Sequence, residues 1–148
     1  MFHPFSRMTR RSERTRRGAA TVEMAVILPV FVTIMLGMIE VGRGLMVGQL
    51  MTNAAREGAR LAVINGTTNS DVSTQVKTFM QGAANVAQAD TTVNITISNT
   101  AAAGQLTGAT TGDLVTVTVT IPFSKVSYLP ANYLANVTLS GSSAMRHE

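Results

Sequence analysis

Residues 17 to 40 read RGAATVEMAVILPVFVTIMLGMIE, and this stretch decides the fold of the chain. It begins where a cluster of arginines ends, and no charged residue lies between Glu23 and Glu40. From Met24 to Ile39, nine residues are Val, Ile, Leu or Phe. Because such residues favour a bilayer by about 0.3 to 0.6 kcal/mol each, together they favour insertion by roughly 3 to 5 kcal/mol. The stretch therefore predicts a membrane-spanning helix.

We expect the transmembrane helix to cover residues 19 to 41. Its charge-free part, Met24 to Ile39, reaches about 24 Å as a helix, which is less than a hydrocarbon core of about 30 Å. The longer range reaches about 34 Å but places Glu23 inside the membrane edge, where a carboxylate is costly unless it finds a partner. Glu23 is therefore a candidate functional residue, although a carboxylate at the positive end of a helix is also favourable by about 0.3 to 1 kcal/mol. Pro29 should kink the helix because it removes one backbone hydrogen bond.

The positive charge of the chain is concentrated in its first residues. Residues 1 to 18 hold six arginines and one glutamate, whereas the remainder carries a net charge of −1, which gives +4 in total. The high isoelectric point thus describes a tail and not a basic domain, so no nucleic acid is expected as a partner. A basic segment before an apolar run stays on the cytoplasmic side, and its composition argues against stable structure. Two alternatives are an RNA-binding tail and a cleaved secretory signal, although the apolar run is longer than the usual 7 to 15 residues of such a signal.

Helical signals continue beyond the span, through residues 42 to 66. Small and apolar residues recur on one face, among them Leu45, Leu50, Ala54, Ala55, Ala59, Leu61 and Ala62. Glu40 and Arg43 are three residues apart, a spacing at which opposite charges pair on a helix surface. Gly44 and Gly48 allow either close packing against another helix or bending, and the sequence leaves both open. Asn65-Gly66 is the expected end of the helix.

Residues 67 to 148 read as a small extracytoplasmic domain. A second helix is expected over residues 70 to 89, with Ser70 as its cap and Asp71 at its positive end. Period-two alternation predicts strands at 92 to 98 and 115 to 121, the second ended by Pro122, and a last strand at 137 to 145. Residues 123 to 135 should form a short helix or an apolar loop. The predicted fold class is α+β: a long N-terminal membrane-spanning helix, a second helix and about three antiparallel strands.

No motif for catalysis or for binding a cofactor or metal is present. The chain has no Cys, and its two histidines, His3 and His147, lie at opposite ends. Asp71, Asp90 and Asp113 lie near element boundaries, where carboxylates usually cap helices and turns. We therefore expect a protein that is not an enzyme and has no catalytic residues, cofactor or metal.

Three segments carry a resemblance to a known family. The run Arg17 to Glu23 with its apolar continuation resembles the prepilin cleavage signal of type IV pilins and pseudopilins. The segments MIEVGR (38–43) and NAAREGAR (53–60), and the ending MRHE (145–148), look like the TadE family, pseudopilins of the tight-adherence (Flp) system. The signature positions of the helix are Glu40, Arg43, Asn53, Arg56, Glu57 and Arg60. Met24 departs from the pattern, since Tyr or Phe commonly follows the glutamate in the Flp branch.

The resemblance implies a pilin-like fold and a structural role. A membrane-embedded prepilin peptidase would cut between Gly18 and Ala19, which makes Glu23 the fifth residue of the mature chain. A neighbouring subunit's new α-ammonium group would then neutralise Glu23 in an assembled filament. The implied partners are this peptidase, other pilin or pseudopilin subunits, and tight-adherence assembly proteins. The implied location is the inner membrane, crossed once with the N-terminus in the cytoplasm. The alternative is an uncleaved single-pass membrane protein whose outer domain binds a partner or ligand.

Overall fold

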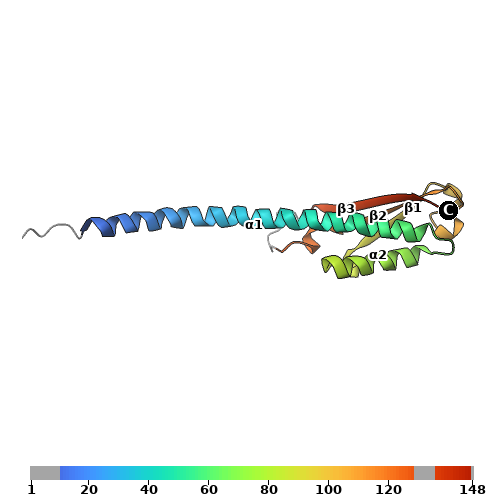
Figure 1. Ribbon diagram of the computed structural model, residues 1–148, viewed down its shortest axis with the longest axis horizontal. Helices are drawn as coiled ribbons and strands as arrows, with labels where there is room; N and C mark the ends of the chain where they lie inside the picture. Colours follow the sequence, from blue (N-terminus) through green and yellow to red (C-terminus); the bar gives the residue numbers. More distant parts are fainter. Residues whose placement is uncertain (1–10, 129–135, 148) are drawn as a thin grey trace, which may run out of the picture. The chain divides into compact units, whose positions relative to one another are not determined.

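The computed structural model describes residues 11–128 and 136–147. It confirms the α+β class, with a long apolar helix, a second helix and a three-stranded antiparallel sheet (Figure 1). The chain divides into two compact units, Met1–Ile39 and Glu40–Glu148. The second unit is called the domain below. Part of the expected loop, residues 129–135, lies outside the described residues.

Helix α1 spans Arg11–Ala62 and continues through Pro29. The expectation that residues 1–17 lack stable structure is wrong for residues 11–17, which belong to this helix. Extending an existing helix adds one hydrogen bond for each residue fixed, whereas starting one is unfavourable, so the apolar span can carry helix into its polar flank. The helix ends three residues before the expected Asn65, and the turn that follows contains Gly66 with φ +86°.

Helix α2 spans Asn69–Ala84, which is shorter than the predicted 70 to 89. Its N-cap is Thr68 and not Ser70, because Thr68 and Asp71 form a reciprocal capping box. The helix stops at Asn85, which adopts the left-handed conformation with φ 55°. Asn tolerates this conformation better than most residues, and a left-handed residue commonly ends a helix.

The sheet has the order β1-β2-β3, with both pairs antiparallel. Strand β1 is Thr92–Ile97, β2 is Leu114–Pro122 and β3 is Thr138–Arg146. All three predicted strands are therefore present, and Pro122 ends β2 as expected. Short 3₁₀ turns lie in the connections, at Gln88–Asp90, Thr100–Ala102, Leu106–Gly108 and Phe123–Lys125.

The core lies between one face of the sheet and both helices (Figure 1). Alternate residues of β2 are fully buried, while the threonines between them face the other side. The core residues are Val47, Met51, Ala54, Ala55, Ala59 and Ala62 of α1, Val72, Val76, Met80 and Ala84 of α2, and Val115, Val117, Val119 and Ile121 of β2. Leu45, which was expected on the apolar stripe of the helix, instead points outward. The small residues of α1 therefore bring the helix close to the sheet.

Candidate functional site

The described side chains of the first unit, from residue 18 on, are mostly apolar on all sides. Residues 18 to 39 of α1 are exposed throughout, and the membrane-span positions Met24 and Ile39 are 64% and 52% exposed. An amphipathic helix has one apolar stripe, whereas a helix that is apolar all round needs an apolar environment. At Pro29, the Thr33 hydroxyl donates a hydrogen bond to the Pro29 carbonyl at 2.8 Å, which satisfies one more polar group inside the helix. Among the described helices, α1 is the one long and apolar enough to cross a membrane.

The expected processing junction lies on the surface of this helix. Gly18 and Ala19 are exposed, and a side chain added at Gly18 would meet no atom within 4 Å. Glu23 lies one turn further on, also exposed, between the apolar side chains of Val22 and Met24. Within the described residues no ion pair or hydrogen bond of the Glu23 side chain is present. The part of the chain that the structure describes thus offers this carboxylate no counter-charge.

Glu40 and Arg43 lie inside the domain and contact a connection distant in sequence. Glu40 is only 8% exposed, and its Oε2 accepts a hydrogen bond from the backbone N–H of Tyr128 at 3.3 Å. The other carboxylate oxygen is buried and has no hydrogen-bond partner. Arg43 donates to the Ala84 carbonyl at 2.7 Å, and its guanidinium lies 4.9 Å from the centre of the Tyr128 ring.

The expected ion pair between Glu40 and Arg43 is wrong. The two side chains have different partners. Glu40 accepts a hydrogen bond from Tyr128 in the connection to β3, while Arg43 donates one to the carbonyl of Ala84 at the C-terminus of α2. A second, longer hydrogen bond joins Arg43 Nε to the Val126 carbonyl at 3.4 Å. Sequence reasoning identified both charged residues but missed Tyr128 and Ala84, because no local spacing links positions more than forty residues away. Their only sequence signal is the presence of Glu40 and Arg43 in an otherwise apolar region.

Gly44 and Gly48 border an apolar groove of about 440 Å³ on the surface of the domain. The groove is lined by Val41, Gly44, Leu45, Gly48, Gln49, Phe123, Val137, Leu139 and Ser140. A Cβ atom on Gly44 would lie 2.8 Å from the ring of Phe123. Gly44 therefore allows close packing within the chain itself, and the continuous helix shows that neither glycine breaks it.

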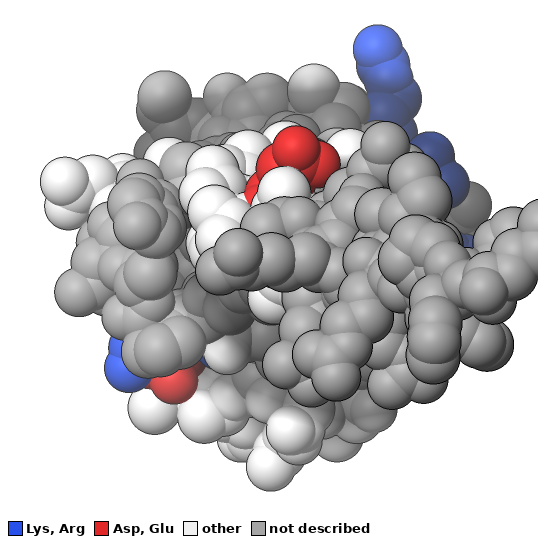
Figure 2. Space-filling view, turned by 90° about the vertical axis from the view of Figure 1, so that its left-hand side faces the viewer, with Lys and Arg blue, Asp and Glu red and all other residues white. Residues whose placement is uncertain are grey.

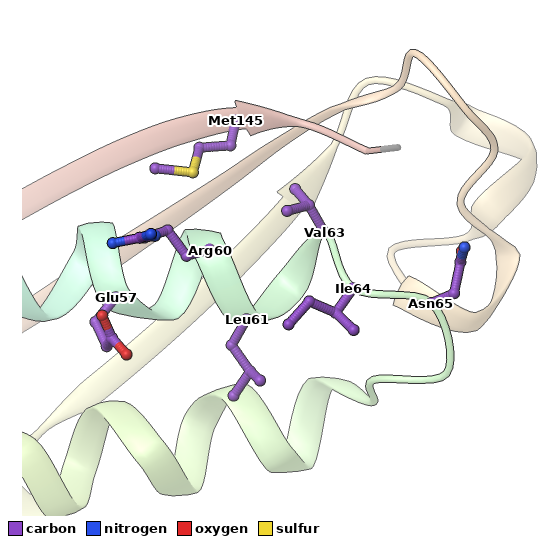
Figure 3. A pocket seen from close by; sticks show the side chains of 7 residues that line it. All are labelled: Glu57, Arg60, Leu61, Val63, Ile64, Asn65 and Met145. Carbon is purple, nitrogen blue, oxygen red and sulfur yellow. The ribbon is translucent and has the colours of Figure 1, made fainter.

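The remaining signature residues, Asn53, Arg56, Glu57 and Arg60, lie on the exposed face of α1. Glu57 and Arg60 line an open pocket of about 840 Å³, together with Leu61, Val63, Ile64, Asn65 and Met145. Figure 3 shows Glu57, Arg60 and Leu61 projecting from α1, with Met145 on β3 above them. The two charged side chains form no ion pair with each other. Among the residues that line this pocket, no nucleophile lies beside a general acid or base.

The three aspartates singled out in the sequence have separate local roles. Asp71 belongs to the capping box, Asp90 forms an ion pair with Lys125 at 3.0 Å, and Asp113 accepts a hydrogen bond from the backbone N–H of Thr110 at 2.7 Å. Hydrogen bonds from Thr68 lower the pKa of Asp71, and the backbone bond from Thr110 is the main cause that lowers the pKa of Asp113. The described part of the chain contains no cluster of three metal-ligating side chains. In Figure 2 the coloured charged groups lie in a few places, one of which joins a basic and an acidic group.

One apolar helix followed by a small α+β domain indicates a single-pass membrane protein. The family model described as TadE-like protein matches residues 18–60, which confirms the resemblance found along the first helix; the ending MRHE lies outside the matched residues. The matched region runs along α1 from the expected cleavage junction to Arg60 and supports, at the level of the family, a pilus-related pseudopilin with a structural role. No curated protein and no solved structure matched the chain.

Proposed function

We propose that this protein is a TadE-like pseudopilin, a membrane-anchored structural subunit that takes part in assembling a tight-adherence (Flp, type IV) pilus or a related secretion apparatus. The observation that carries the proposal is the coincidence of the family match with the apolar helix: residues 18–60 include the Gly18-Ala19 junction, the span and the signature positions. The helix anchors the subunit in the inner membrane. The domain lies outside the cytoplasm, where it meets other pilin subunits and assembly proteins.

Processing occurs between Gly18 and Ala19 in this proposal. Two features support it: the junction is exposed, and Gly18 has no side chain to hinder a protease near the peptide bond. Cleavage removes the six arginines and leaves a new α-ammonium group on Ala19. The exposed and unpaired Glu23 is then the acceptor for the ammonium group of a neighbouring subunit, which offsets the cost of placing a carboxylate next to lipid.

Mass spectrometry of the N-terminus tests the processing step directly. The full chain is expressed in cells with an active prepilin peptidase and purified from the membrane. The expected mature N-terminus is Ala19, and Gly18→Asp should block its formation. Mature protein that keeps Met1 would disprove the cleavage. A normal pilus from the Gly18→Asp variant would favour the uncleaved single-pass protein with a binding domain.

The role of Glu23 is tested by Glu23→Ala. We expect cleavage to continue, because the junction is unchanged, and the amount of assembled pilus to fall severalfold. Glu23→Asp, which keeps the carboxylate, is the matched control and should keep most of the assembly. If Glu23→Ala cells assemble as much pilus as the wild type, the pairing of Glu23 with a neighbouring ammonium group is wrong.

A further inference from the structure

The exposed apolar residues of the domain are unevenly distributed. Among the described residues of the domain, the large ones are Val41, Leu45, Met46, Ile64, Leu114, Tyr128 and Val137. Val41, Leu45 and Val137 line the same groove. Met46 and Tyr128 both contact Arg43: a guanidinium nitrogen lies 3.9 Å from the Met46 sulfur, and the guanidinium carbon lies 4.9 Å from the centre of the Tyr128 ring. These five residues, which we call the apolar collar, lie in the first turns of α1 inside the domain and in the connection from β2 to β3. Ile64 and Leu114 lie elsewhere and do not line the groove.

The collar reverses the arrangement expected of a helix in water. Between residues 40 and 46 the charged side chains are turned inward: Glu40 is buried against Tyr128, and Arg43 reaches the carbonyl of Ala84. The large apolar side chains face outward, and Leu45 is 69% exposed. A helix surface in water places its charges outside and its leucines inside. The outer surface of these turns therefore suits an apolar neighbour.

The composition of the collar identifies that neighbour as the surface of a lipid bilayer. Tyr combines an apolar ring with a polar tip and is enriched at membrane interfaces, and an arginine or lysine next to it suits the headgroup level. Arg43 lies over Tyr128, and Lys125, which forms an ion pair with Asp90, precedes Tyr128 by three residues in the same connection. Since Glu40 is buried, the nearest carboxylate of α1 does not face the lipid headgroups.

The length of the apolar surface points the same way. The charge-free residues 24 to 39 reach only about 24 Å, which is short for a hydrocarbon core of about 30 Å. With Glu40 and Arg43 turned inward, the large exposed side chains in the first turns of the domain, up to Met46, are apolar. The apolar side chains of these first turns therefore add to a span that is short by itself, so the bilayer can be matched without drawing Glu23 into its interior.

We infer that the apolar collar lies in the bilayer at the boundary between headgroups and acyl chains, so that the domain is partly embedded in the membrane surface. The inference rests on the membrane anchoring in the proposed function and adds a second contact with lipid. It assigns Leu45, Met46 and Val137 to lipid, and it assigns Ile64 and Leu114 to water.

Single-cysteine labelling tests this assignment cleanly because the chain has no Cys. The full chain is reconstituted at about one copy per vesicle, in zwitterionic phospholipid with a minor anionic fraction. An environment-sensitive fluorophore is attached at Leu45, Met46 or Val137. The matched controls are Ile64 and Leu114, which are 57% and 43% exposed, and the reference for the span is Phe31. Circular dichroism of each variant verifies that the fold is kept.

We expect labels at Leu45, Met46 and Val137 to be quenched severalfold more by lipids carrying a quencher near the headgroup than by an aqueous quencher. Labels at Ile64 and Leu114 should show the opposite preference. If the collar labels behave like Ile64 while Phe31 is quenched by lipid, the collar inference is wrong and the anchor stands. If Phe31 is also quenched from water, the proposed anchoring itself fails. Collar labels protected from both quenchers would show that protein covers them, which also overturns the inference.

Discussion

At the scale of single residues, the domain depends on places where the backbone of one element touches another. Gly141 of β3 is the tightest of these. A Cβ atom there would lie 2.7 Å from the backbone of both Met51 and Thr52 in α1, and backbone atoms cannot rotate away as a side chain can. By contrast, a Cβ atom on Gly82 of α2 would meet no atom within 4 Å. Replacing each glycine by alanine therefore separates the effect of close packing, at Gly141, from the effect of backbone freedom, at Gly82.

We predict that Gly141→Ala lowers the free energy of unfolding of the domain by about 1 to 3 kcal/mol, since it forces the strand away from α1. Gly82→Ala should leave it unchanged or raise it by roughly 0.5 to 1 kcal/mol, because alanine favours a helix over glycine. Denaturant unfolding of the full chain in detergent, followed by circular dichroism, measures both. Equal stability of the two variants would contradict the close contact at Gly141.

The capping box makes a second prediction at this scale, on pH. Hydrogen bonds from Thr68 lower the pKa of Asp71 in the folded protein below the ordinary value of an aspartate. A carboxyl with a lowered pKa stabilises the fold above the unfolded value of about 3.9, and this contribution is lost as pH falls through the lowered folded pKa. We expect Asp71→Asn to weaken the loss of stability between about pH 5 and pH 2. Thr68→Ser, which keeps the hydroxyl, should retain the wild-type pH profile of the melting temperature.

At the scale of elements, α1 and α2 are joined through Arg43. The last residue of α2, Ala84, has a carbonyl with no partner inside the helix, and Arg43 donates to it at 2.7 Å. The positive guanidinium at this position also suits the negative end of the helix. The same side chain holds the connection after β2 through Val126. One residue of α1 thus positions the ends of two other elements.

We predict that Arg43→Met destabilises the domain by about 1.5 to 3 kcal/mol, because it leaves the Ala84 carbonyl without its charged donor while it keeps the bulk of the aliphatic stem. Arg56→Met, at an exposed position of the same helix, should change stability by no more than about 0.5 kcal/mol. Thermal unfolding of both variants in the same detergent provides the comparison. Identical melting temperatures would rule out the coupling of α2 to α1 through Arg43.

At the scale of the whole molecule, the protein consists of two units that differ in where their apolar side chains lie: exposed in the first unit and mostly buried in the second. Residues 18 to 39 expose apolar side chains on all sides, whereas the domain has its own core. The apolar side chains of the span favour a bilayer by roughly 3 to 5 kcal/mol, and a central arginine costs about 2.5 to 3.5 kcal/mol on the same scale. A single charge in the span therefore removes most of the favourable free energy.

We predict that Phe31→Arg reduces the membrane-integrated fraction of the protein severalfold. Leu114→Arg, at an exposed apolar position of the domain, should leave it unchanged. Extraction of membranes at high pH, followed by immunodetection in pellet and supernatant, measures this fraction. If Phe31→Arg protein remains entirely in the pellet, α1 is not the membrane anchor.

Much of the fold could be predicted because it depends on local patterns. Period-two alternation located the first two strands, the less regular third strand was also predicted, and Pro122 marked the end of β2. Helix boundaries that depend on particular side chains were harder to predict from the sequence. The cap of α2 is Thr68 and not Ser70, and the helix ends at Asn85, earlier than predicted. In the candidate site, the exposed position of Glu23 follows from its place in the span, whereas burial of Glu40 does not follow from its sequence neighbours.

The sequence by itself determined the class of protein: an apolar run with a basic flank, helical and strand periodicities, and the signature segments that the TadE-like family model matches at residues 18–60. These depend on neighbouring residues and need no tertiary contact. Only the tertiary structure decided which way Glu40 and Arg43 point, because their partners at Tyr128, Ala84 and Val126 are brought to α1 by the folding of the sheet and α2. That choice turns the charges inward and leaves Leu45 and Met46 outside, and so it sets how far along α1 the apolar surface extends.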